Sequence, residues 1–260
     1  MAAGGNQRVS REPDDRTPVV HTPSETLAYA AHDYQWLLDR DYPDQQALQL
    51  CGNRFRLSRT ERGMLFRGVF SQAASRTRSE RLIVPDALDA EPSHAAANTG
   101  DLVIDGHNVL FTVWNCLAGR PLVRATDGFI RDIGGTRGRL PHDQRFTRVA
   151  ELLCATMAAA GFRSISMLLD AQLPWSRDQS AELAATWARG GFAATEFTAA
   201  VHESVDAAVA ASKDATIATS DTGIIDRCRQ PVLDLGGRIV TGSFRAVPLE
   251  MEHLCVTGAR

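Results

Sequence analysis

LVIDGHNVLF, residues 102–111, is the stretch that decides the fold class, because an apolar run stops there at Asp105 and a helical pattern follows at once. Two later stretches have the same form: SISMLLD ends at Asp170, and ATIATS is followed by Asp221. Aspartate is depleted from strands, so each apolar run predicts a short strand that ends at its aspartate. Functional sites in open parallel sheets form outside the carboxyl ends of the strands. The pattern therefore predicts one sheet edge that carries these carboxylates.

The segment 101–245 alternates between strand-like and helical patterns. Further strands are predicted at GFAATEF (191–197), TIATS and PVLDL (231–235), and a helix is predicted over 200–212. Strands that alternate with helices predict a mostly parallel sheet with helices on both faces, which is an α/β fold. The glycine- and arginine-rich stretch 121–142 interrupts this alternation and is predicted to form a hairpin or flap.

The rest of the chain is predicted to contain a tail, a helical domain and a linker. Residues 1–22 are polar and lack periodic apolar positions, which is typical of a disordered tail. Residues 23–84 carry short apolar stripes at helical spacing, so a small all-α, helix-turn-helix-like domain is expected there. Residues 85–100 mix Pro, Ala, Asn and Gly and are interpreted as an interdomain linker. Residues 246–260 are interpreted as a C-terminal tail.

A cation would allow the aspartates of the predicted sheet edge to lie close together, since carboxylates otherwise repel one another. Oxygen ligands suit Mg²⁺ or Mn²⁺, so these ions are the expected cofactors. Asp206 is a fourth candidate ligand, because it lies near the edge of the buried stripe of the predicted helix 200–212. Glu203, three residues earlier, is its expected surface neighbour. Asp127 and Asp132 of the predicted hairpin are further candidates.

Each candidate acid also fits an ordinary structural role. Asp105 and Asp221 precede predicted helices and can cap them, and Asp170 can cap a turn. Asp127 and Asp132 fit turns. Capping and metal binding are compatible for Asp221, because the N-terminus of a helix keeps a carboxylate ionised.

Basic residues concentrate in 51–82, which holds eight arginines and two glutamates, a local charge of +8 − 2 = +6 in a chain of net charge −3. Contacts to the phosphate backbone dominate nucleic-acid affinity, and the arginine side chain matches phosphate geometry. A solvated helical face is the alternative interpretation. The candidate nucleic-acid-binding residues are Arg54, Arg56, Arg59 and Arg67, with Arg131 and Arg137 of the predicted hairpin.

Several function classes lack their motifs in this sequence. The five cysteines include no CxxC pair, which argues against a disulfide framework and a zinc ribbon. The nucleophile motif GxSxG and the phosphate-binding motif GxxxxGK are absent, and the glycines of 128–138 do not spell the dinucleotide fingerprint. The sequence shows neither a signal peptide nor an apolar run that could span a membrane, so a cytoplasmic protein without a membrane partner is expected.

Taken together, LVIDGHNVLF, LLD, the helix acid and ATSDTGIID resemble the PIN-like nuclease superfamily, including its NYN relatives. The resemblance implies an α/β/α sandwich and a Mg²⁺- or Mn²⁺-dependent ribonuclease site of acids at strand ends. The residues that match this site are Asp105 with Asn108 as its companion, Asp170, Asp206, and Asp221 preceded by Ser220.

The chain is also similar to a prokaryotic family catalogued as domain of unknown function 434. A helical segment similar to YPDQQALQLCGNRFRLSRTERGMLFRGVF (42–70) precedes an α/β domain in that family. The motif ATDGFIRDIGG (125–135) is typical of the same group and departs from PIN-like nucleases in general. This insertion leaves the substrate class open.

The leading hypothesis is a divalent-metal-dependent phosphodiesterase that acts on RNA. In this hypothesis Asn108 orients Asp105 or the attacking water. A non-catalytic RNA-binding or regulatory protein on the same fold is the alternative. A phosphatase of the haloacid dehalogenase type ranks last, because its chemistry requires DxD after the first strand, where this chain has Asp105-Gly106-His107. The expected partner is nucleic acid, RNA before DNA, and a homo-oligomer is an open option.

Overall fold

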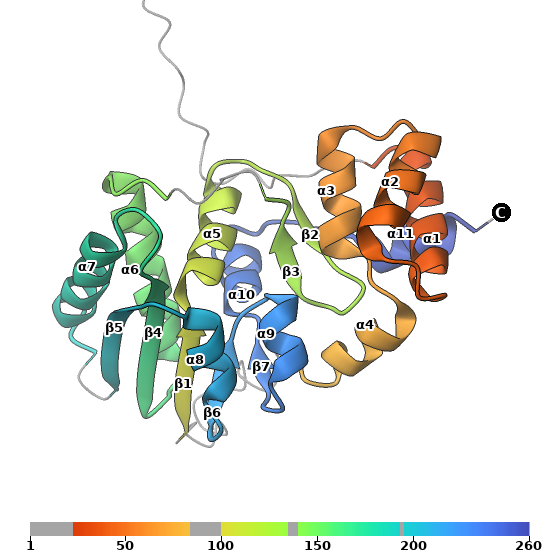
Figure 1. Cartoon of the computed structure of the whole chain (residues 1–260). Coiled ribbons are helices and arrows are strands. Elements are labelled where there is room, and N and C mark those ends of the chain that lie inside the picture. The colour runs from red at the N-terminus through yellow and green to blue at the C-terminus, as the bar shows by residue number, and fades with distance from the viewer. Residues whose placement is uncertain (1–22, 84–99, 135–139, 193–194, 260) are drawn as a thin grey trace, which may run out of the picture.

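The computed structural model describes residues 23–83, 100–134, 140–192 and 195–259. The expected tail 1–22, all of the expected linker except Gly100, and Arg137 lie outside the described residues. The described chain contains an α/β layer and a group of short helices beside it (Figure 1). None of the described helices has the length and apolar character needed to cross a lipid bilayer.

The main sheet has the strand order β5-β4-β1-β6-β7, and all of its strands are parallel. Its strands are β1 (Asp101–Asp105), β4 (Ser164–Asp170), β5 (Glu196–His202), β6 (Ala215–Ala218) and β7 (Val232–Leu233). In the register of the sheet Asp105 pairs with Leu168 of β4, and Ile104 pairs with Ala218 of β6. The mostly parallel sheet predicted from the sequence is confirmed, and β1 occupies its centre.

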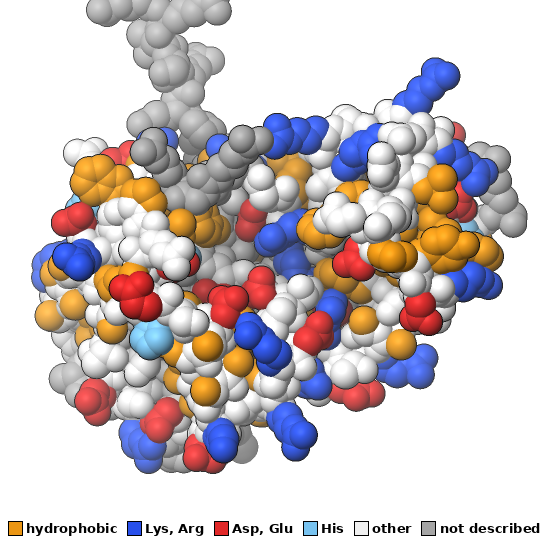
Figure 2. All heavy atoms as spheres, viewed as in Figure 1, with side chains coloured by type: hydrophobic (Ala, Val, Ile, Leu, Met, Phe, Trp, Pro, Cys, Tyr) orange, Lys and Arg blue, Asp and Glu red, His pale blue; other side chains and the backbone are white. Residues whose placement is uncertain are grey.

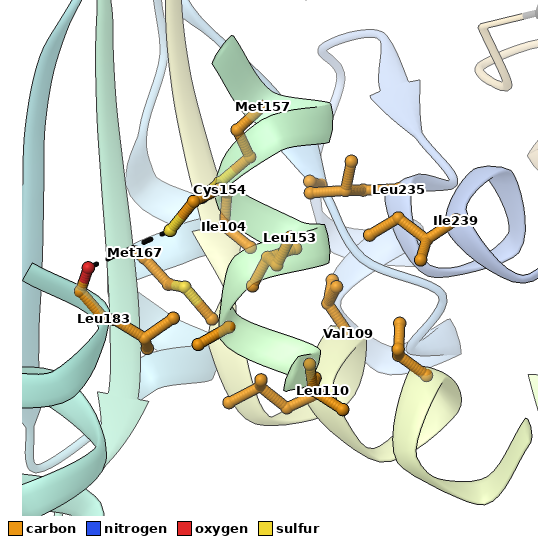
Figure 3. Packing of buried hydrophobic residues seen from close by; sticks show 14 of the residues in the cluster. Ile104, Val109, Leu110, Leu153, Cys154, Met157, Met167, Leu183, Leu235 and Ile239 are labelled. Atoms are coloured by element: carbon orange, nitrogen blue, oxygen red, sulfur yellow. Dashed lines mark hydrogen bonds between the residues drawn. The ribbon is translucent and has the colours of Figure 1, made fainter. Parts of the chain in front are cut away.

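Helices cover both faces of this sheet, as expected for an α/β/α sandwich. They are α5 (Gly106–Leu117), α6 (Gln144–Ala159), α7 (Ser176–Arg189), α8 (Val205–Ala211), α9 (Thr222–Arg227) and α10 (Leu235–Gly242). On one face Leu102 and Ile104 pack against α5, α6 and α10, a contact region shown in Figure 3. On the other face Val103 packs beneath α8 and α9. Burial on both faces explains why the strands read as apolar runs.

The predicted hairpin within 121–142 is confirmed as β2 (Leu122–Arg124) and β3 (Ile130–Asp132), which pair in antiparallel fashion. It is not a free flap, because β2 also pairs in parallel with β8 (Leu249–Glu250) near the C-terminus. Val123 of β2 is fully buried among the N-terminal helices. The hairpin therefore joins the two parts of the structure.

The N-terminal helices are α1 (Glu25–Leu38), α2 (Asp44–Arg54), α3 (Arg59–Gly68) and α4 (Gln72–Ser79). Ser58 begins α3 with a capping box, in which its hydroxyl oxygen accepts from the Glu61 amide and the Glu61 carboxylate accepts from the Ser58 amide. Leu27, Tyr34 and Leu65 form the centre of an apolar cluster that also contains Val123. These helices are therefore packed onto the hairpin instead of standing apart.

The interpretation of 246–260 as a tail is wrong for its central part. Met251–Thr257 forms helix α11, which packs against α1 (Figure 1). Met251, Leu254 and Cys255 are buried in the same cluster as the N-terminal helices. The sequence offered only one and a half turns of apolar pattern here, too little to identify a helix whose stability comes from tertiary packing.

The boundaries around β5 also differ from those predicted. The strand expected at 191–197 lies at Glu196–His202, and the helix expected over 200–212 begins at Val205. Pairing with β4 extends the strand through Ala199 and Ala200, although alanine favours helices. Glu203 consequently lies in the bend between β5 and α8, so the helical pairing of Glu203 with Asp206 is wrong.

We predict that Met251→Ala destabilises the whole N-terminal cluster. Met251 is 0% exposed, and removal of a buried methionine side chain costs about 2–5 kcal/mol because it leaves a cavity. Val256→Ala on the same helix is the control, since Val256 is 70% exposed and its truncation should change stability by less than about 0.5 kcal/mol. Chemical denaturation followed by circular dichroism measures both, and equal stabilities would show that α11 does not complete the core.

Candidate functional site

Asp105, at the carboxyl end of the central strand, is the buried centre of the candidate site. Its side chain caps α5, with Oδ1 accepting from the Asn108 amide at 3.4 Å. Oδ2 accepts from the Thr219 hydroxyl at 2.9 Å. Asp105 is 7% exposed. The capping interpretation from the sequence is confirmed, and it leaves the carboxylate at the sheet edge where a functional site was expected.

Gly106 allows α5 to begin directly against the sheet. A Cβ atom at this position would lie 2.6 Å from the carbonyl oxygen of Leu168, which is backbone and cannot move aside. Its φ is not among the positive values, so close approach and not a left-handed turn requires glycine here. This contact fixes the start of α5 and, with it, the orientation of Asp105.

The loop between β6 and α9 is held against Asp105 by two polar side chains. Asn108 Oδ1 accepts from both the amide and the hydroxyl of Ser220, at 2.8 and 3.0 Å. The Thr219 hydroxyl oxygen accepts from the Asp221 amide at 3.0 Å while it donates to Asp105. The sequence pattern did not identify Thr219, because a single hydroxyl residue between a predicted strand and a predicted site acid is not a distinctive signal. The structure brings Asp105, Asn108, Ser220 and Asp221 together.

Asp221 and Asp206 are the carboxylates whose charges act on Asp105. Asp221 caps α9 by accepting from the Ile224 amide at 3.1 Å, and Asp206 lies exposed in the first turn of α8. Burial is the main reason that the pKa of Asp105 rises from 3.8 to about 7. The Thr219 hydrogen bond opposes this rise, whereas the charges of Asp221 and Asp206 add to it. These acids are therefore close enough to interact electrostatically.

Figure 2 shows the distribution of acidic and basic side chains on one face of the molecule. Acidic side chains gather in a hollow in the middle of the face, between the α/β layer and the N-terminal helices, with basic side chains beside them. Arg227 approaches Asp206 at 3.7 Å, but both side chains are exposed, and such pairs contribute little. In the described part of the chain no basic side chain lies within ion-pair distance of Asp105 or Asp221.

Asp170 lies at the same edge, at the end of β4, but in a different local environment. Its carboxylate accepts from the Gln172 amide at 2.8 Å, so its turn-capping role is confirmed. Its amide donates to Nδ1 of His107 at 2.9 Å, which leaves Nε2 of His107 to donate to Gln179 Oε1 at 3.2 Å. Burial lowers the pKa of His107 and favours this neutral ring. Asp170 is absent from the groups that shift the pKa of Asp105.

Asp127 and Asp132 take the turn roles that the sequence left open. Asp127 accepts from the Phe129 amide, and Asp132 accepts from the Gly134 amide. Asp127 is also fully buried against Arg131, whose Nη1 and Nη2 donate to it at 2.7 and 2.9 Å. The Nε of Arg131 donates to the Ser220 carbonyl at 2.7 Å. These contacts hold the loop of the candidate site from the hairpin side.

The candidate nucleic-acid-binding arginines divide into exposed and buried groups. Arg54, Arg56 and Arg59 are exposed, and Arg54 pairs with Asp33 at 3.1 Å. Arg67 is half-buried near Asp132. Arg131 is buried, because the hairpin holds its guanidinium against Asp127, and its contact with a phosphate backbone stays a prediction. The strand β3 is only three residues long, so the alternation of its side chains could not indicate from the sequence which face would be buried.

The aspartates do not form a closed cage of metal ligands. Within the ranges that the structure describes, no group of three or more His, Cys, Asp or Glu side chains has the geometry to hold a metal ion. All four of the predicted ligands, Asp105, Asp170, Asp206 and Asp221, are described. Any metal bound here would therefore take part of its coordination from water or substrate.

We predict that metal-free protein loses stability as the pH rises from about 4 to about 7. The folded pKa of Asp105, about 7, exceeds its ordinary value of 3.8, so the folded state binds this proton more tightly than the unfolded state does. The contribution is therefore fully present in acid and is lost as Asp105 ionises. Between pH 5 and pH 8 the free energy of unfolding of the wild type should fall by on the order of 2 kcal/mol relative to that of Asp105→Asn. Urea denaturation in EDTA measures the difference, and parallel pH profiles would contradict it.

Comparison with family models assigns the two parts of the chain separately. Residues 94–238, which contain every strand of the main sheet, match the family described as Domain of unknown function (DUF5616). Residues 26–81, which cover the N-terminal helices except Glu25, match Protein of unknown function (DUF434), the family expected from the sequence. Neither the curated proteins nor the solved structures gave a match. Since the first model spans more than half of the sequence, the chain belongs to the family Domain of unknown function (DUF5616), and its N-terminal helical segment matches the DUF434 model.

Proposed function

We propose that this chain is a divalent-metal-dependent phosphodiesterase of PIN-like type that cleaves RNA. The observation that carries the proposal is the buried Asp105 at the end of the central strand, with Asp221 and Asp206 near enough to raise its pKa. A buried carboxylate is costly without a counter-charge. No described basic side chain supplies that charge, so a cation is the natural partner of this site.

The oxygen donors present suit Mg²⁺ or Mn²⁺. Mg²⁺ usually keeps several waters and binds through one or two carboxylates together with substrate phosphates. Asp105 and Asp221, joined through Thr219, are the two residues that would hold it, and this arrangement agrees with the lack of a three-ligand group among the described residues. The ion, when bound, would supply an activated water and charge stabilisation at the scissile phosphate.

The residues around Asp105 and Asp221 hold the site in place before substrate arrives. Asn108 binds the Ser220 amide and hydroxyl, Arg131 binds the Ser220 carbonyl, and Gly106 fixes the start of α5. A site supported by such contacts loses little free energy to reorganisation during reaction. Asp206 stays exposed to solvent, where its carboxylate can accept a hydrogen bond from an incoming water.

We predict that the full chain cleaves labelled single-stranded RNA in Mn²⁺ or Mg²⁺ and that EDTA abolishes this activity. Asp105→Asn and Asp221→Asn should each reduce the cleavage rate by about 100-fold or more, because each removes a charge that the ion requires. Asp214→Asn is the matched control, since Asp214 is exposed immediately before β6, at the opposite end of that strand. Equal rates for wild type, Asp105→Asn and Asp221→Asn would eliminate the proposed site.

A non-catalytic RNA-binding protein is the second candidate, and the lack of a three-ligand group in the described residues favours it. Thermal unfolding with and without Mn²⁺ separates the two functions, because an ion that binds only the folded state raises Tm. If the chain is a metal-dependent enzyme, Mn²⁺ should raise the Tm of the wild type, and Asp105→Asn should remove this rise. RNA binding with no cleavage and no such rise would establish the second function.

A further inference from the structure

A pocket of about 130 Å³ lies where the helical segment meets the loop of the proposed site. Phe66, Arg67, Phe70 and Arg78 line it from the helical side, and Arg131 and Asp221 line it from the α/β side. The hollow of Figure 2, with acidic and basic side chains next to each other, lies between the same two parts of the structure. The wall of this pocket therefore includes a proposed metal-binding residue.

We propose that this pocket receives one phosphate group of a nucleic-acid strand, with Arg67 contacting a phosphate oxygen and the exposed Phe66 stacking on the base of the same nucleotide. The proposal rests on the proposed function, since it places this nucleotide beside the phosphodiester bond that the aspartates would cleave. It assigns the DUF434 helical segment a direct role in substrate binding.

Arg67 is the lining arginine that can turn toward an incoming anion. Its side chain is 34% exposed, compared with 10% for Arg78 and 3% for Arg131. Its Nε donates to the Asp132 carbonyl at 3.0 Å, which anchors the guanidinium, while its Nη2 remains 3.9 Å from the Asp132 carboxylate. Neither of its Nη atoms makes a hydrogen bond within the described residues, so both donors are available to a phosphate.

Arg78 and Arg131 form the fixed wall behind Arg67. Arg78 donates two hydrogen bonds of 2.7 Å to Asp226, and Arg131 is held in the same way by Asp127. Both guanidinium groups lie over the Phe70 ring, at 4.5 and 5.0 Å from its centroid. Nη1 of Arg78 is buried without a hydrogen-bond partner among the described residues. Oδ2 of Asp127 lies 3.7 Å from this nitrogen, so its charge is balanced within the protein.

Phe66 supplies an aromatic surface next to that phosphate contact. It is 39% exposed although its neighbours Met64 and Leu65 are buried in the helical core. A single exposed aromatic is ordinary, but this one is adjacent to Arg67 and lines the same pocket. Stacking of a base on an aromatic side chain contributes about 1–3 kcal/mol and tolerates any base.

The charges of the pocket favour a nucleotide over free phosphate. Asp221 and Asp44 line the pocket, and the three arginines face Asp132, Asp226 and Asp127. With this many carboxylates the pocket has no strong excess of positive charge. Stacking and the metal-bound part of the strand must therefore contribute to affinity, and inorganic phosphate alone is expected to bind poorly.

Fluorescence anisotropy of the full chain in Ca²⁺ with labelled ten-nucleotide single strands, one RNA and one DNA, tests the proposal. Phe66→Ala and Arg67→Gln should each raise Kd by about tenfold. The matched controls are Trp36→Ala, another exposed aromatic outside the pocket, and Arg229→Gln, an exposed arginine shortly before β7 at the other end of the sheet, and both should stay within about twofold of wild type. The RNA and DNA strands separate ribose-dependent binding from binding through phosphate and base alone.

If Phe66→Ala and Arg67→Gln bind the labelled strands with the same Kd as their controls, the proposal is overturned. If both variants lose binding and the wild-type chain cleaves no RNA, the result supports the pocket and refutes the proposed catalysis. Cleavage that depends on Asp105, with unchanged kcat/KM in both pocket variants, refutes the pocket and supports the proposed function. Thermal unfolding confirms that the variants fold, which is expected because both side chains are partly exposed.

Discussion

Parallel pairing of β1 between β4 and β6 sets both the packing of the core and the geometry of the candidate site. It places Asp105 next to the loop that follows Ala218, so that one hydroxyl, Thr219, can donate to Asp105 and accept from the Asp221 amide. A slip of one residue would move every side chain of β1 to the other face. Leu102 and Ile104 would then leave the cluster of α5 and α6, so core packing and site geometry are set by the same register.

The contact between the helical segment and the α/β layer is partly ionic and partly apolar. Val123 and Met251 bring apolar surface from the hairpin and the C-terminal helix into the N-terminal cluster. Arg78 pairs with Asp226 of α9 and approaches Asp127 of the hairpin at 3.7 Å. Arg78 is buried, so loss of its carboxylate partners would leave an uncompensated buried charge, which is strongly destabilising. These pairs therefore specify how the helices sit over the β6–α9 loop.

This arrangement gives the two matched families one shared surface. The DUF434 segment contributes Phe66, Arg67 and Arg78 to the pocket, and the DUF5616 segment contributes Arg131 and Asp221. The acids proposed to hold a divalent ion lie on one side of that surface, and Phe66 and Arg67 lie on the other. The combination suits a ligand that carries both a phosphodiester and a base, which is the chemical basis of the proposals made for this protein.

The fold class and the sheet edge at which the acids gather follow from local sequence patterns. Apolar runs that end in aspartate specify buried parallel strands, and the carboxyl ends of such strands share one edge, so Asp105, Asp170 and Asp221 were found there. Local pattern also located α1, α3 and the hairpin, because caps and turns depend on neighbouring residues. Long-range contacts set the remaining features: the Asp170 amide binds His107, Arg131 is buried and binds the Ser220 carbonyl, Thr219 joins two acids, and α11 completes the N-terminal core. Each of these outcomes depends on contacts between residues far apart in the chain, and a short local pattern carries no information about such partners.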